Sequence, residues 1–336
     1  MNATDSRLTS VRSGSKFKEF LQRIKYDQWK GWVYLFPCIV LLLIFTGWPI
    51  VNTLAMAFQN GYDTMEWLSG VNFTIGIDNF LKVISYSGFK DCLLNTVLLC
   101  VITVPISTFL ALLIAVCLNS IKPLSRFLQT IYFLPYVTNS IAIGMVFAAM
   151  FNIVGLNRAD INASTSLGIV NNIIQFFGGT PINWINAGSG YWENIFVMVV
   201  YIVWNALPFK ILILLGGLQS VNKQYYDAAK IDSTPKWRVF TNITVPLLSP
   251  MIAYVVITGF IGGFKEYSSI VGIFGDTMGP PGAKGRLNTM VGYIYDAING
   301  STKQYGRASA AAIILFLIIF AVTLVNLQVS KKKTHY

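Results

Sequence analysis

Six long apolar stretches constrain the fold of this chain more than any other feature of its sequence. They run approximately through residues 33–58, 93–117, 127–151, 194–215, 247–274 and 308–327. A helix needs about 20 apolar residues to cross the roughly 30 Å hydrocarbon core of a bilayer. Because a backbone amide left unpaired in lipid is costly, each stretch must be helical. The pattern predicts an all-α fold, a polytopic membrane helix bundle with six transmembrane helices.

The composition argues against a soluble protein. Hydrophobic residues make up 54% of the 336 residues and charged residues only 12%, whereas roughly a quarter of the residues in a soluble domain are charged. The net charge of +11 would raise the question of nucleic acid in a soluble chain. Here the basic residues gather at the ends of apolar runs, and no basic stripe with interleaved aromatic residues is present. We therefore expect the lipid bilayer as a partner and no nucleic acid.

The distribution of Lys and Arg predicts the orientation. Sixteen of these residues fall in the N-terminal tail, the loops after the second and fourth stretches, and the C-terminal tail, and seven fall in the other loops. The positive-inside rule then places both termini on the cytoplasmic side of the membrane. We expect this membrane to be the cell membrane, that is, the inner or cytoplasmic membrane. Residues 1–30 form a basic cytoplasmic tail, residues 31–329 a transmembrane domain, and residues 330–336 a second basic tail. The first apolar run begins too late and is too long for a cleaved signal peptide.

Residues for catalysis and metal binding are scarce. His335 is the only histidine, and the four cysteines contain no C-x-x-C pair and lie in or beside apolar runs. The sequence also lacks the G-x-x-x-x-G-K-[ST] loop that cradles nucleotide phosphates. We expect no catalytic residue, no metal site and no cofactor in this chain, which we interpret as a non-catalytic subunit.

The loop after the fourth stretch is the most informative segment. Asp227 is followed by Ala228 and Ala229, which favour helix and present a small, smooth surface. We expect Asp227 early in that helix, where its carboxylate would suit the positive dipole end and could meet a partner Arg. Pro235 suits the first turn of a second helix. An apolar stripe for the floor of the bundle follows, at Trp237, Phe240 and Ile243.

This loop, about residues 217–250, closely resembles the "EAA" coupling loop of the permeases of ABC importers. That pattern contains Glu-Ala-Ala, a Gly four residues after the second Ala, and then Ile-x-Leu-Pro. The positions that match or flank it are Asp227, Ala228, Ala229, Asp232, Ser233, Ile243 and Pro246. Ser233 stands where the family has Gly, so either the turn takes another shape or it tolerates about 1 kcal/mol of strain. The plain alternative is an ordinary amphipathic loop, against which several positions in register argue.

The resemblance extends from about residue 31 to 329 and implies a transport machine. In such importers two permeases each form half of the pathway, two cytoplasmic ATPase subunits bind ATP-Mg, and an extracytoplasmic protein delivers the substrate. The second permease is expected to be homologous, in a heterodimer. Stretches such as 181–184, 204–209 and 263–267 resemble the carbohydrate-uptake branch, and thus a mono- or oligosaccharide cargo. The alternatives are a polyol, glycerol phosphate or peptide cargo, or a stand-alone secondary carrier.

Several residues are candidates for the substrate pathway: Trp204, Lys265, Glu266 and Tyr267. A charge near the centre of a span costs about 2.5–3.5 kcal/mol, so Lys265 and Glu266 should face the interior or a wet cavity, or else snorkel at the outer interface. We expect Lys210 to snorkel at the cytoplasmic end of its span. The long loops 59–92, 152–193 and 275–307 predict either a partner-binding or lid function or short interfacial helices.

Overall fold

The computed structural model describes residues 30–62, 73–121, 125–155, 161, 166–301 and 303–333. The predicted N-terminal tail, apart from Lys30, and the last three residues of the C-terminal tail lie outside the described residues. The chain divides into two compact units, one up to Met56 and one from Ala57 onward. The described part of the first unit is most of a 29-residue apolar helix, Lys30–Phe58, which includes a π-helical segment, η1 (Leu43–Gly47), and α2 (Trp48–Phe58).

The second unit contains three long continuous helices. These are α5 (Ser87–Ser120), α9 (Tyr191–Ser220) and α16 (Tyr305–Lys333). Two further apolar stretches each form a bent pair of helices: Thr130–Val137 with Ser140–Phe151, bent by 102°, and Lys236–Leu247 with Ser249–Gly263, bent by 68°. The described residues thus hold four helices able to cross a membrane, or up to six if each bent pair is one span. The all-α membrane fold is confirmed, and the count of six and the side of each terminus stay predictions.

The bends have local causes. Helix α6 (Ser125–Val137) contains Pro135 near its end, and α7 (Ser140–Phe151) begins after Asn139, whose side chain accepts hydrogen bonds from the backbone N–H groups of Ile141 and Ala142. Such an N-cap starts a new helix with its own direction. The second pair runs through α11 (Lys236–Val239), η3 (Phe240–Thr244) and α12 (Val245–Leu247) into α13 (Ser249–Gly263), which has Pro250 at its start.

The fifth predicted stretch, 247–274, is broken a second time. Helix α13 ends at Gly263, and α14 (Ser268–Phe274) begins after a four-residue break that contains Lys265 and Glu266. Helix α14 packs against α7. The two helices approach each other closely at Gly144 and Gly272, where a Cβ on Gly144 would lie 2.6 Å from the Gly272 Cα. Small residues allow this close approach of two helices in lipid, where hydrophobicity alone does not hold helices together.

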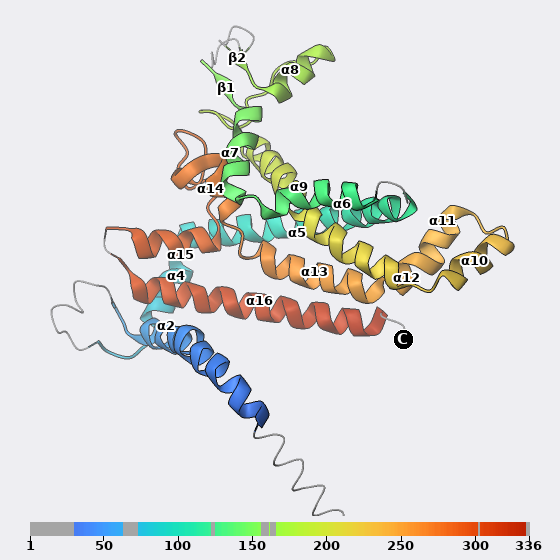
Figure 1. Ribbon diagram of the computed structural model, residues 1–336. Coiled ribbons are helices and arrows are strands. Elements are labelled where there is room, and N and C mark those ends of the chain that lie inside the picture. Colours follow the sequence, from blue (N-terminus) through green and yellow to red (C-terminus); the bar gives the residue numbers. More distant parts are fainter. Residues whose placement is uncertain are drawn as a thin grey trace, which may run out of the picture. The chain divides into compact units, whose positions relative to one another are not determined.

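The two ends of this unit carry different connections (Figure 1). Helices α10 (Lys223–Ile231) and α11 lie at one end, together with the C-terminal end of α16. Helices α4 (Asp78–Ser85) and α15 (Met290–Asn299) lie at the opposite end. The long loops also hold α8 (Ile169–Phe176), the 3-10 turn η4 (Gly275–Thr277) and a short antiparallel pair, β1 (Ile153–Val154) with β2 (Ser166–Leu167). The long loops thus contain short helices, as the second of the two interpretations of loop length expected.

Candidate functional site

Helices α10 and α11 form a projecting hairpin at the end of the bundle. Asn222 caps α10 by accepting a hydrogen bond of 3.0 Å from the Gln224 N–H. Ala229 is buried against the bundle, while Ala228 is exposed. The Tyr226 hydroxyl lies 3.4 Å from the Thr244 hydroxyl, which joins α10 to η3. The small Ala229 side chain therefore brings α10 close to the bundle and leaves its other face in solvent.

The position predicted for Asp227 was wrong. Asp227 is the fifth residue of α10, beyond the first turn, so it does not complement the positive end of the helix dipole. Its carboxylate instead forms an exposed ion pair of 3.3 Å with Lys230. Exposed pairs of this kind contribute little to stability. The carboxylate thus lies on the solvent side of the hairpin, where a partner can reach it.

The turn after α10 resolves the question raised by Ser233. The Thr234 N–H donates to the Ala229 carbonyl at 2.9 Å, and the Ser233 N–H donates to the Lys230 carbonyl at 3.1 Å. These two bonds define a Schellman C-cap, in which the residue at the Ser233 position is usually Gly in the left-handed conformation. Ser233 adopts this conformation, with φ = 51°. The chain therefore keeps the turn that Gly would make and tolerates the strain.

The apolar stripe was predicted correctly only in part. Phe240 packs against the core cluster at this end of the bundle, and Ile243 is half-buried. Trp237 instead is 72% exposed, and Ile231 at the end of α10 is 84% exposed. Pro235 is the N-cap of α11, one position earlier than the first turn in which it was expected. Pro246, the last position of the matched pattern, lies exposed in α12, just before the bend into α13.

Of the four pathway candidates, three lie together in the break between α13 and α14. The Glu266 carboxylate accepts a hydrogen bond of 3.1 Å from the Ser269 N–H and so caps the start of α14. Lys265 is exposed, and the Tyr267 ring lies 5.1 Å from the Tyr295 ring. The fourth candidate lies elsewhere, on α9, where Trp204 packs against Phe147 of α7 with ring centroids 5.2 Å apart.

A polar cluster that the sequence did not reveal joins α9 to the first bend. Tyr201 is fully buried in α9 and donates its hydroxyl to the Ser140 carbonyl. The Asn205 side chain, one turn further on, donates to the Ser140 hydroxyl at 3.3 Å. Broken helices that face polar side chains within a membrane bundle are a common construction for solute pathways. The only hint in the sequence was the polar triplet 138–140 inside an apolar stretch.

Lys210 does not snorkel, contrary to the prediction. Its side chain is 5% exposed, and its ammonium group points from α9 into α5. There it donates to the Ser107 hydroxyl at 2.7 Å, the Thr108 hydroxyl at 3.0 Å and the Val104 carbonyl at 3.3 Å. Three acceptors match the three donors of an ammonium group. We call Lys210 and these three acceptors the ammonium cage.

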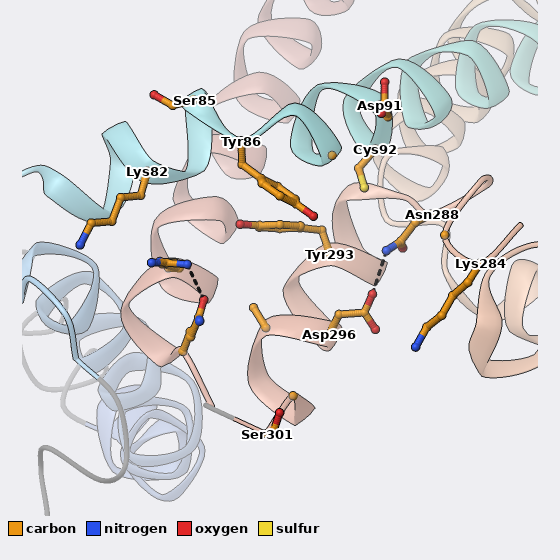
Figure 2. A pocket seen from close by; sticks show the side chains of 16 residues that line it. Lys82, Ser85, Tyr86, Asp91, Cys92, Lys284, Asn288, Tyr293, Asp296 and Ser301 are labelled. Atoms are coloured by element: carbon orange, nitrogen blue, oxygen red, sulfur yellow. Dashed lines mark hydrogen bonds between the residues drawn. The ribbon is translucent and has the colours of Figure 1, made fainter.

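A large cavity, which we call the distal cavity, lies at the end of the unit opposite to α10 and α11. It measures about 880 Å³ and lies between α4, the start of α5, the loop 284–288, α15 and the start of α16. Figure 2 shows side chains that line it, among them Lys82, Tyr86, Lys284, Asn288, Tyr293 and Asp296. Partial burial raises the pKa of the Asp296 carboxyl, while the Asn288 amide and the Lys284 ammonium act in the opposite direction.

Comparison with known proteins places the chain among transport proteins. Residues 104–335 match the family described as "Binding-protein-dependent transport system inner membrane component". The chain is 26% identical over 310 residues to a lactose transport system permease protein of Rhizobium radiobacter, a match that covers 92% of this chain and 96% of the relative. It is 31% identical over 302 residues to an arabinooligosaccharides transport system permease protein of Halalkalibacterium halodurans, covering 89% and 87%.

A solved structure shares the fold. It is described as a bacterial ABC transporter involved in the import of the acidic polysaccharide alginate. The match has a TM-score of 0.72 at 21% identity and covers 94% of this chain and all of the other.

Proposed function

Since the chain belongs to the family of binding-protein-dependent transport system inner membrane components, we propose that it forms half of the translocation pathway of an ATP-driven importer for a mono- or oligosaccharide. Family membership confirms the resemblance inferred from the coupling loop and makes the chain a multi-pass inner-membrane protein. The cargo class is supported by the relatives, which are named as permeases for lactose and for arabinooligosaccharides.

The hairpin of α10 and α11 is the surface through which ATP hydrolysis drives the permease. The observation that carries this step is the exposure of Ile231 and Trp237 on a hairpin whose other face is anchored at Ala229. Large apolar side chains exposed together mark a surface that another protein covers. The Schellman cap holds the two short helices at a defined angle, so a force applied to the exposed tip reaches the bundle.

The proposed partners follow from the family to which the chain belongs. In this proposal two cytoplasmic ATPase subunits bind ATP-Mg, in agreement with a sequence that has no nucleotide-binding loop. A second, homologous permease completes the pathway, and an extracytoplasmic binding protein delivers the cargo. A structure of the bacterial alginate transporter in complex with an alginate pentasaccharide-bound periplasmic protein supports such an assembly by analogy.

The pathway itself runs along the bend between α6 and α7 and the break between α13 and α14. Trp204, Lys265, Glu266 and Tyr267 are the residues of this chain that we assign to it, beside the cluster at Ser140. The support is positional, because helix breaks free backbone groups that must be satisfied by neighbours or by a water-filled route. Rocking of the two halves of the transporter, driven from the hairpin, would open this route to one side at a time.

An Ile231→Glu substitution tests the coupling surface. A carboxylate at this exposed apolar position should abolish copurification of the ATPase subunits and ATP-driven uptake, while membrane insertion stays normal. Ile75→Glu is the matched control, because Ile75 is 86% exposed and lies on the other side of the sequence-predicted membrane domain. Retention of the ATPases by the Ile231→Glu variant, at the level of Ile75→Glu, would refute the proposal.

A further inference from the structure

We propose that the distal cavity is a receiving subsite for a neutral oligosaccharide, separate from the helix breaks. This inference rests on the proposed sugar import and adds a place in the chain where cargo is held before it crosses. The cavity volume of about 880 Å³ falls within the roughly 300–1,000 Å³ typical of small-molecule sites. A cavity of this size accommodates more than one sugar ring.

The walls of the distal cavity are held in place by buried hydrogen bonds. Asn95 of α5 donates to the carbonyls of Arg286 and Asn288, at 3.0 and 2.9 Å. The Met290 N–H at the start of α15 donates to the Thr96 hydroxyl at 3.0 Å. These bonds join the loop 284–288 and α15 to α5 across almost 200 residues of sequence. The cavity is therefore a built feature between fixed elements, and a ligand need not organise it.

One wall offers an acceptor in a defined position. The Asp296 carboxylate accepts a hydrogen bond of 2.8 Å from the Asn288 amide, and Asn288 is itself buried and accepts from the Thr289 N–H. A single amide leaves most of the acceptor capacity of a carboxylate unused. In Figure 2 Lys284 extends toward Asp296 from the facing loop. A hydroxyl group placed between them would donate to the carboxylate and accept from the ammonium.

Another part of the lining is aromatic. Tyr86 is 55% exposed, and its ring lies 5.9 Å from that of Tyr293, which Phe89 braces from the side. Gly88 keeps this arrangement possible, since a Cβ there would lie 2.6 Å from the Tyr86 ring. The C–H face of a pyranose ring can pack against such an exposed, braced ring while its hydroxyls reach the polar wall.

The charges of the lining favour a neutral ligand. Three cations, Lys82, Lys284 and Arg307, face two carboxylates, Asp91 and Asp296, within one cavity. An anionic sugar would gain from the cations but would be repelled by the carboxylates, and a cationic ligand would meet the reverse. Hydroxyl groups donate and accept at once, so a neutral oligosaccharide uses both kinds of group without an unpaired charge.

The test is saturation-transfer NMR on the assembled transporter in lipid nanodiscs, without the binding protein, using lactose, maltose and arabinotriose as probes. We expect at least one probe to bind weakly to the wild type, and both Tyr86→Ala and Asp296→Ala to weaken that binding about tenfold, the equivalent of one charged hydrogen bond. Tyr86→Phe keeps the ring and should bind as the wild type does, which separates the ring from the hydroxyl. Normal copurification of the ATPase subunits with Tyr86→Ala and Asp296→Ala checks that both variants fold.

Uptake of the same probes by proteoliposomes that contain the binding protein separates this inference from the proposed function. Uptake of a sugar that gives no signal in the wild type, or a signal unchanged in Tyr86→Ala and Asp296→Ala, would overturn the subsite and leave the importer intact. Stronger binding of tri-galacturonate than of the neutral probes would also overturn it. Absence of uptake for every sugar would instead refute the carbohydrate assignment, and the subsite with it.

Discussion

The ammonium cage leads to an asymmetric prediction: removing the cation should cost less than removing one of its acceptors. In Ser107→Ala, the buried Lys210 ammonium loses its shortest hydrogen bond, of 2.7 Å. Hydrogen bonds to charged groups contribute about 1.5–3 kcal/mol, and the Lys210 nitrogen remains buried. We therefore expect Ser107→Ala to lower the free energy of unfolding by about 1.5–3 kcal/mol.

In Lys210→Met the buried charge disappears, and its acceptors stay satisfied. The Thr108 hydroxyl donates to the Val104 carbonyl at 2.7 Å, and the Ser107 hydroxyl donates to the Thr103 carbonyl. Met is unbranched and fills a similar path. Replacing a buried charged group by a well-packed apolar one is often neutral or stabilising, because the desolvation of the charge is avoided. The expected change is less than about 1 kcal/mol in either direction.

Equilibrium unfolding of the purified chain in mixed micelles, titrated with sodium dodecyl sulfate, measures both effects. Ser120→Ala is the matched control. On the same helix, the Ser120 hydroxyl donates to the carbonyl four residues earlier, that of Val116, at 3.0 Å, as the Ser107 hydroxyl does to that of Thr103, but it has no lysine partner among the hydrogen bonds described. In the double variant Ser107→Ala/Lys210→Met the cost of the serine substitution should vanish, as expected of residues that act together. A Lys210→Met variant that unfolds more readily than Ser107→Ala would refute the reasoning.

Three further predictions concern the backbone and the break. Gly144→Ala should destabilise the fold by about 1–3 kcal/mol, since the new Cβ meets Gly272. Gly216→Ala, whose Cβ would meet nothing within 4 Å, should be neutral or stabilising by up to about 1 kcal/mol. Equal changes in melting temperature for the two variants would contradict this. Ser233→Gly should raise stability by about 0.5–1 kcal/mol in thermal unfolding by relieving the left-handed strain, and an unchanged or lower melting temperature would argue against strain. Glu266→Gln should keep the melting temperature, because the amide oxygen still caps α14, but should lower sugar uptake; full uptake would remove Glu266 from the pathway.

The apolar helices and the segment that resembles a coupling loop could be recognised in the sequence because both depend on local properties. A membrane-length apolar run must be helical wherever it packs, and the spacing from Asp227 to Pro246 is a property of one continuous segment. The sequence left two shapes open for the turn at Ser233, and the structure decided for the left-handed residue of a helix C-cap. The local sequence could not predict which side chains are buried, as the exposed Trp237 and the buried Lys210 show.

Only the tertiary structure decided which distant residues meet. Lys210 finds its acceptors on a helix about a hundred positions earlier, and the distal cavity joins residues near 86 to residues near 293. In lipid, apolar surface does not select a partner helix, so the choice depends on close contacts such as Gly144 with Gly272 and on buried polar bonds. These contacts arise only once several helices are assembled. For that reason no single apolar stretch encodes the ammonium cage, the packing of α7 against α14 or the distal cavity.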